Sequence, residues 1–471
     1  MTATINMSAT AIAVNRFGLG VSANGDPMPN DAKKWLNTQF EHYQAVPNAW
    51  ANQRKTSAIN ADLTQYQMQT RNTSNNDQES VKHAFKRNVR DDYLTAVNAR
   101  TESALNTPTP FVERLVHFWS NHFAVSVQKP AVTDLAGAFE LEAIRPFVLG
   151  NFKDMLLAVE KHPAMLLYLD QAKSIGPNSR AAERLAARDP SKKRGLNENL
   201  AREILELHTL GVRSGYTQAD VTEFARALTG WSVAGDNAKD KNVVVGDNGF
   251  IFRPQIHEPG SRTIMGKSYA QTNQAQTNQA QAEAVLNDLA SSPATARHIA
   301  TKLVQHFVGD TPPSRLIDNL ASTFLSSDGN LTQVYHALID AQEAWQPAPA
   351  KFKTPWEWLI SSLRGLGRNN LDGINVAQML NELGEPAWKP GSPAGYDDIA
   401  DTWAAPNALL RRVEMAQRLA AQMGDKLDAR VLADKLLLGA TSSVSIMQIS
   451  RAESATTGLA LLLVCPEFLR K

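Results

Sequence analysis

The chain has 471 residues, and its 48 Lys and Arg residues nearly balance its 47 Asp and Glu residues, which leaves a formal net charge of +1 at pH 7. This balance excludes a strong overall attraction to nucleic acid or to an anionic membrane surface. The single cysteine, Cys465, excludes an intrachain disulfide and a zinc site built on cysteines, but it does not identify the compartment. The composition is typical of a soluble globular protein with two or three cores, or with one elaborated helical domain.

The N-terminal region has no recognisable targeting segment. The first charged residue is Arg16, and the apolar run 11–14 is too short for the core of a signal peptide. The apolar run 459–465 is under half the length of a membrane span. We therefore expect a soluble protein that stays in the cytoplasm.

Helical periodicity dominates the chain from residue 31 onward. We predict a mainly α fold, a bundle-like array of many helices with a small antiparallel β element near residues 231–270. The predicted helices cover 31–44, 111–124, 136–147, 152–160, 197–210, 218–229, 282–290, 293–308, 313–325, 331–345, 354–367, 407–423 and 428–438. The expected regions are an N-terminal helical region (1–171), a basic loop (172–196), a helix-turn-helix with the β element (197–270) and a C-terminal helical region (271–471), unless all of them form one continuous domain.

Three further segments depart from this pattern. Residues 54–90 are polar, which predicts either a mobile segment or a solvated helix. The pentapeptide AQTNQ occurs twice within 270–279, as in a surface loop or a helix extension. Residues 386–406 are rich in Pro, Gly and Trp, and we expect an ordered loop packed over the helices, because Trp388 and Trp403 are poorly suited to water.

The segment FVERLVHFWSNHFA (111–124) predicts an amphipathic helix that carries His117, Asn121 and His122. His117 and Asn121 lie one turn apart, whereas His122 points about 140° away from His117. The aromatic neighbours of His122 predict that it is at least partly buried. Two interpretations stay open, a neutral hydrogen-bonded histidine or a metal ligand or acid–base group.

A second amphipathic helix is predicted at 197–210. Glu203 and Glu206 share one face with Asn199, and Arg202 lies at the edge of that face. Two carboxylates at this spacing can bind a divalent metal ion. They can equally pair with arginines of a neighbouring helix, so both interpretations stay open.

Two other polar groups lie outside these helices. His257 follows the predicted strand in GFIFRPQIHEPG and precedes a turn, a position from which it can project into a cleft. His298, Lys302 and His306 lie along one side of the 293–308 helix, where a solvated face is favoured over a phosphate site. A capping box is expected to begin at Thr217.

Ordered motifs along the whole chain resemble a known family. They are AVNRFGLG, FWSNHFAVS, HPAMLLYLD, NENLAREILELHTLGV with GYTQADVTEFARALTGW, HEPG with TIMGK, SDGNL, KTPWEWLISSLRGLG, WKPGSPAGY and ALLLVCPEFLRK. Together they resemble the bacterial domain-of-unknown-function family numbered 1800. The chain departs from that family at Cys465, where serine is more frequent, and at the AQTNQ repeat, which looks like a local insertion.

The resemblance implies little about activity, because the family has no assigned function. Its genes often neighbour those of a second uncharacterised family, numbered 1501, which resembles sulfatases and alkaline phosphatases and usually carries an export signal. The resemblance therefore implies a protein partner from family 1501, and it leaves open an export in complex with that partner.

Several motifs of known enzymes are missing from the sequence. There is no Gly-x-Gly-x-x-Gly after a strand, no phosphate loop, no Gly-x-Ser-x-Gly and no His-Glu-x-x-His. Their absence weighs against nucleotide-binding, serine-hydrolase and zinc-protease functions.

Two hypotheses about function follow. The first is a metal-dependent enzyme of unknown substrate, in which His122, Glu203, Glu206 and His257 hold a divalent metal ion and Asn121 and Arg202 assist. The alternative is a non-catalytic helical scaffold or accessory protein for the phosphatase-like partner. The enzyme hypothesis needs these side chains in one cleft, whereas separate ion pairs favour the scaffold.

Overall fold

The computed structural model describes residues 7–23, 28–72, 75–188, 195–235, 243–271 and 275–471. In the first half of the chain the helices are α1 (Ala9–Ala11), α2 (Ala32–His42), α3 (Thr56–Asn72), α4 (Asn75–Asn106), α5 (Pro110–His122), α6 (Leu135–Phe139), α7 (Phe152–Lys161), α8 (Pro163–Tyr168), α9 (Arg180–Arg188), α10 (Asn199–Glu203) and α11 (Gln218–Leu228). In the second half they are α12 (Ala275–Ala290), α13 (Pro293–Phe307), α14 (Ser314–Ser326), α15 (Leu331–Asp340), α16 (Pro355–Gly365), α17 (Val376–Leu383), α18 (Ala400–Trp403), α19 (Pro406–Met423), α20 (Ala429–Leu437), α21 (Ser443–Ser450) and α22 (Ala455–Val464).

The strands are short and lie where the sequence predicts them. They are β1 (Trp231–Val233), β2 (Val244–Val245), β3 (Phe250–Phe252), β4 (Arg262–Ile264) and β5 (Lys267–Tyr269). The first three form an antiparallel sheet in the order β1-β3-β2, and β4 pairs with β5 as a separate antiparallel hairpin. The mainly α fold with a small antiparallel β element is therefore confirmed.

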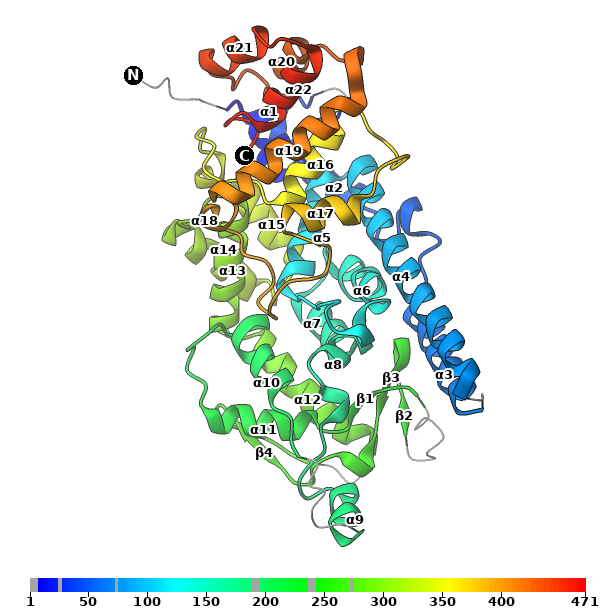
Figure 1. The fold of residues 1–471 in the computed structure, drawn as a ribbon. Helices are drawn as coiled ribbons and strands as arrows, with labels where there is room; N and C mark the ends of the chain where they lie inside the picture. Colours follow the sequence, from blue (N-terminus) through cyan, green and yellow to red (C-terminus); the bar gives the residue numbers. More distant parts are fainter. Residues whose placement is uncertain (1–6, 24–27, 73–74, 189–194, 236–242, 272–274) are drawn as a thin grey trace.

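Figure 1 shows an elongated molecule with the strands toward one end and helices α20 and α21 at the other. One continuous hydrophobic core extends from Met7 to Leu469. The division of the chain into four regions stays a prediction. In the part of the chain that the structure describes, no helix is both long and apolar enough to cross a membrane.

Helix α5 is the buried centre of the middle region. Proline at its first position suits a helix start, because the N–H that proline lacks would have no partner within the helix. Every residue of α5 except Asn121 is buried, including the charged Glu113 and Arg114. Buried charges need partners, so α5 brings polar side chains into contact with those of the surrounding helices.

Helix α16 begins with a capping box. The Thr354 amide donates to the Glu357 carboxylate (3.0 Å), and the Glu357 amide donates to the Thr354 hydroxyl (3.4 Å). The predicted capping box at the start of α11 is also present, with Thr217 and Asp220. Such caps satisfy the first N–H groups of a helix and therefore place its first turn accurately.

The irregular segments differ in how well they were predicted. The polar segment 54–90 forms α3 and much of α4, which agrees with a solvated helix. The expected loop 172–196 contains α9, a helix without a buried residue whose alanine-rich sequence favours helix formation; residues 189–194 lie outside the described residues. The second AQTNQ copy begins α12, whereas residues 272–274 of the first copy lie outside the described residues. The 386–406 segment packs on the helices as expected, with its Trp388 and Trp403 buried.

Candidate functional site

A cavity of about 330 Å³ lies against α5. Its walls come from α4, α5, α13, the first turn of α16 and the loop 385–399. This volume lies at the lower end of the range for small-molecule sites, which suits a ligand of metabolite size. Charged side chains line the cavity together with aromatic rings, so it is the candidate functional site.

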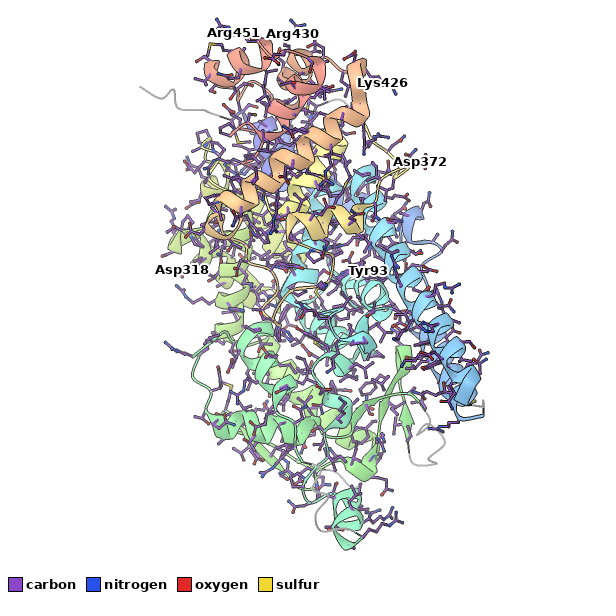
Figure 2. The ribbon with its side chains drawn as sticks, in the orientation of Figure 1. Tyr93, Asp318, Asp372, Lys426, Arg430 and Arg451 are labelled. Atoms are coloured by element: carbon purple, nitrogen blue, oxygen red, sulfur yellow. The ribbon has the colours of Figure 1, made fainter. Side chains whose placement is uncertain are left out.

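The loop 385–399 covers the cavity, and hydrogen bonds hold it to the helices. The side-chain amide of Asn121 donates to the Tyr396 carbonyl (2.9 Å), and its side-chain oxygen accepts from the Tyr396 amide (2.7 Å). Tyr93 of α4, labelled in Figure 2, donates to the Ala387 carbonyl (3.1 Å). Asn121 therefore lines the cavity but uses both ends of its side-chain amide to position the loop.

Gly395 allows the loop to approach α5 this closely. Its φ is +80°, in the left-handed region that favours glycine. A Cβ atom at this position would lie 2.3 Å from the backbone oxygen of Asn121. A larger residue would therefore have to move one of the two backbones.

Arg100 of α4 is held on three sides. Its Nε lies 2.9 Å from the buried Glu140 carboxylate, and the ring centroids of Trp356 and Trp388 lie 4.4 Å and 5.2 Å from its guanidinium carbon. Glu140 also accepts from the Ser120 hydroxyl (2.9 Å) and from the indole of Trp388 (3.1 Å), which fixes the carboxylate. Within the described residues, the two terminal nitrogens of Arg100 have no hydrogen-bond acceptor. They are available to a ligand in the cavity.

Glu385 lies at the N-terminus of α16. Its carboxyl oxygen accepts from the Trp356 amide (2.7 Å), and the Thr354 hydroxyl also bonds to it. Burial, assisted by the negative charge of Glu357, raises the pKa of Glu385 to about 7, although the hydrogen bonds and Arg100 favour the anion. Glu385 and Arg100 line the same cavity without forming an ion pair. A carboxyl group of this kind is able to give or accept a proton at neutral pH.

His117 orients one of the two tryptophans. Its Nδ1 accepts from the indole N–H of Trp356 (3.0 Å), and its Nε2 lies 3.7 Å from the Glu113 carboxylate. Burial lowers the pKa of His117 well below its usual range, and the Arg100 charge adds to this effect. The imidazole is therefore neutral, and its role is to hold the ring that packs on Arg100.

The wall beside α13 is a network of paired charges. Arg114 binds the Glu357 carboxylate (2.9 Å) and donates from Nε to His306 (3.1 Å), whose other ring nitrogen donates to Asp398 (2.6 Å). Lys471 also pairs with Glu357. Although burial alone would raise it, Lys471 and Arg114 lower the pKa of Glu357 to about 2. These groups stabilise the wall and leave no free charge toward a ligand.

Lys302 of α13 is different, because its ammonium forms no ion pair with any described residue although it lines the cavity. Burial lowers its pKa, and Asp398 and Asp397 oppose that shift. The expected solvated face of His298, Lys302 and His306 is therefore not observed. The loop 385–399 covers this side of α13, a long-range contact that helical periodicity cannot reveal.

His122 ends α5 at the edge of the cavity and is 3% exposed. Its Nε2 donates to the His208 carbonyl (3.2 Å), and its Nδ1 is buried without a partner among the described residues. The Glu160 carboxylate lies 2.7 Å from Nδ1 of His208. In a regular α-helix with about 100° per residue, His208 would point roughly opposite to the face of Glu203 and Glu206, but a π-helical turn at Ile204–His208 changes the direction of its side chain.

The other predicted residues lie elsewhere. Arg202 pairs with Glu206 (3.3 Å) on a partly exposed surface, and burial raises the pKa of Glu203. His257 is 5% exposed and donates from Nδ1 to the Thr229 carbonyl (2.7 Å), beside the β element. None of these four predicted residues lines the cavity.

Metal binding was tested on geometry as well. Considering only the residues that the structure describes, no group of three or more His, Cys, Asp or Glu side chains is placed to hold a metal ion. The predicted ligands His122, Glu203, Glu206 and His257 are described, and they do not form such a group. The metal site therefore gains no geometric support and stays a prediction.

Arg100 and Glu385 were not predicted from the sequence. Arg100 lies in a polar helix with many exposed charges, and its partners Trp356 and Trp388 are distant in the sequence. Glu385 precedes a Pro- and Trp-rich loop, where a single carboxylate has no diagnostic spacing. The only available signal was the concentration of aromatic residues in that loop, which indicated packing rather than chemistry.

Comparison with known proteins gives a family but no activity. The model of a family described as a protein of unknown function (DUF1800) matches residues 12–470, nearly the whole chain. No curated protein matches the chain. No solved structure matches it either.

Proposed function

Since the chain belongs to the DUF1800 family of proteins of unknown function, we propose its function from the cavity: it is an enzyme that binds a small anionic substrate and moves a proton with Glu385. The observation that carries the proposal is that one cavity is lined by Glu385, which has no ion-pair partner among the described residues, by Arg100, whose two terminal nitrogens have no acceptor there, and by the ammonium of Lys302. Glu385, Arg100 and Lys302 all belong to the lining of this cavity.

The roles follow from the contacts. Arg100 and Lys302 attract and hold the anion, because the two terminal nitrogens of Arg100 and the ammonium of Lys302 have no acceptor among the described residues. In its carboxylate form, Glu385 takes a proton from the substrate, and in its carboxyl form it returns that proton. The pKa of Glu385, about 7, suits both proton transfers. In such a step a substrate C–H bond breaks, an O–H bond forms on Glu385, and the electron pair stays on the substrate carbon.

Deuterium exchange tests this proposal without knowledge of the product. The protein is incubated in D₂O with a panel of small carboxylates, phosphate esters and sulfate esters, and loss of substrate C–H signal is followed by ¹H NMR. We expect exchange into at least one compound at neutral pH, with loss of at least about 100-fold in Glu385→Gln, the usual scale for a lost acid–base group.

A matched control separates the site from general damage. Arg297→Gln removes a surface arginine whose side chain is 59% exposed, and it should exchange like the wild type. Arg100→Gln should lose exchange. An absence of exchange with every compound, or equal rates in Glu385→Gln and the wild type, would refute the proposal.

The two sequence-based hypotheses are distinct from this proposal. The metal-dependent form would use His122, Glu203, Glu206 and His257, and metal analysis of the purified protein tests it. The accessory role beside a phosphatase-like partner of family 1501 is tested by co-purification. No contact of the described residues favours either hypothesis over the cavity.

A further inference from the structure

We propose that the cavity selects a planar carboxylate, bound edge-on by Arg100, over tetrahedral anions such as phosphate. The inference deepens the proposed function, since it names the substrate class of the same cavity. It concerns recognition alone, so it holds or fails independently of proton transfer by Glu385.

The space around Arg100 has a restricted shape. Glu140 occupies the Nε side of the guanidinium, and Trp356 and Trp388 pack within 4.4 Å and 5.2 Å of its central carbon. No described residue accepts a hydrogen bond from the two terminal nitrogens, which form the remaining edge. A carboxylate can meet that edge with two parallel hydrogen bonds in the plane of the guanidinium.

A tetrahedral anion fits this space less well than a planar one. A tetrahedral phosphate that bonds to the same edge places its remaining oxygens above and below the guanidinium plane. The ring centroids of Trp356 and Trp388 lie 4.4 Å and 5.2 Å from the guanidinium carbon, so the two rings limit the space for these extra oxygens. The Trp388 ring is itself fixed through its indole N–H by Glu140 and Ser120, so it cannot move aside without losing hydrogen bonds.

The unpaired positive charge in the cavity also favours a carboxylate. Arg100 is already paired with Glu140, and Arg114 is paired with Glu357. Among the cations that line the cavity, Lys302 is the one without an ion pair to a described residue. One unpaired ammonium matches the single charge of a carboxylate better than the double charge that a phosphate ester carries at neutral pH.

The rest of the lining suits an apolar body behind the carboxylate. Phe118, Pro390, Tyr396 and Ile399 contribute to the walls beside the charged groups. Such a mixture of apolar surface and a few fixed polar groups is typical of small-molecule sites. The ligand class is therefore a small monocarboxylate with an apolar or aromatic body.

Three compounds with one ring and different head groups test the inference by isothermal titration calorimetry. They are benzoate, benzamide and phenylphosphonate. We expect benzoate to bind at least about tenfold more tightly than either of the others, because a lost charge-assisted pair costs a factor of this order. Arg100→Lys keeps the charge but removes the two parallel donors, and it should weaken benzoate binding by about tenfold or more.

Two variants serve as controls for charge and for damage. Lys302→Gln removes attraction without changing the shape of the space beside Arg100, so it should weaken both benzoate and phenylphosphonate and leave benzoate the tighter ligand. Arg297→Lys should bind all three compounds like the wild type. If Arg100→Lys does not fold, Trp388→Phe keeps Arg100 and places a smaller ring beside it, and it should reduce the ratio of phenylphosphonate Kd to benzoate Kd.

Three results would overturn the inference. Phenylphosphonate that binds as tightly as benzoate, benzoate binding unchanged in Arg100→Lys, or no binding of benzoate at millimolar concentration would each do so. Benzoate binding that persists in Glu385→Gln while deuterium exchange is absent in the wild type would instead refute the proposed function and leave the carboxylate site standing.

Discussion

Replacement of Gly395 by alanine tests whether the loop 385–399 is held in place by its close approach to α5. The glycine has φ of +80°, and an added Cβ would lie 2.3 Å from the Asn121 backbone oxygen. A left-handed conformation costs a non-glycine residue ~1–2 kcal/mol. Moving the loop to relieve the overlap would also weaken the two hydrogen bonds between Asn121 and Tyr396, each worth ~1 kcal/mol.

We therefore expect Gly395→Ala to lower the free energy of unfolding by about 3–4 kcal/mol, the sum of the strain and the two lost hydrogen bonds. Urea denaturation followed by tryptophan fluorescence measures it. Gly391→Ala in the same loop is the matched control, because nothing lies within 4 Å of its added Cβ. That control should change stability by no more than about 0.5 kcal/mol. Equal unfolding midpoints for the two variants would show that the close approach is not what holds the loop.

Three further predictions concern titration and metal. The folded pKa of Glu385 (about 7) exceeds its ordinary value of 4.5, so the folded protein binds this proton more tightly than the unfolded chain does. The stability of the wild type relative to Glu385→Gln should therefore be greatest below pH 4.5 and fall as the pH rises to 7. Urea midpoints of both proteins at pH 5 and 7.5 check this, and a difference in midpoint that is the same at both pH values would contradict it. Burial lowers the pKa of Lys353 from 10.5 to about 7, so the folded protein releases that proton first, and wild-type stability relative to Lys353→Met should rise from pH 7 to 10.5. Melting temperatures at pH 7 and 9 measure the difference, and a constant difference would argue against it. Glu203→Gln should leave the metal content of the purified protein unchanged by mass spectrometry, because no three described ligands meet; loss of a stoichiometric metal ion would restore the metal-site hypothesis.

The fold was predictable because its signals are local. Apolar residues at helical spacing, the Thr217 cap and the alternation in the 249–260 segment all act over a few residues, and the structure confirms the elements that they predict. The α9 helix was missed because its basic sequence was interpreted as a loop, and in the structure none of its residues is buried. Local patterns are thus sufficient for elements that bury one face.

The candidate site was not predictable in the same way. Arg100, Glu385 and Lys302 acquire their properties from neighbours on other helices, and a helical wheel treats each helix as if one side always faced water. Lys302 shows this directly, because its polar face is covered by a loop from nearly a hundred residues further along the chain. His208 shows a second cause, the π-helical turn that breaks the regular 100° step.

The loop across α5 also has a consequence for how the chain folds. The hydrogen bonds between Asn121 and Tyr396 join residues 275 positions apart. Such distant contacts form late, because the entropy of closing a long chain segment must be lost before they stabilise anything. On the ribosome, α4 and α5 emerge long before the loop. We therefore expect Arg100 and Glu140 to lie in an open groove until the last quarter of the protein is synthesised. A chain stopped before residue 385 would fold many of the same helices and still have no enclosed cavity.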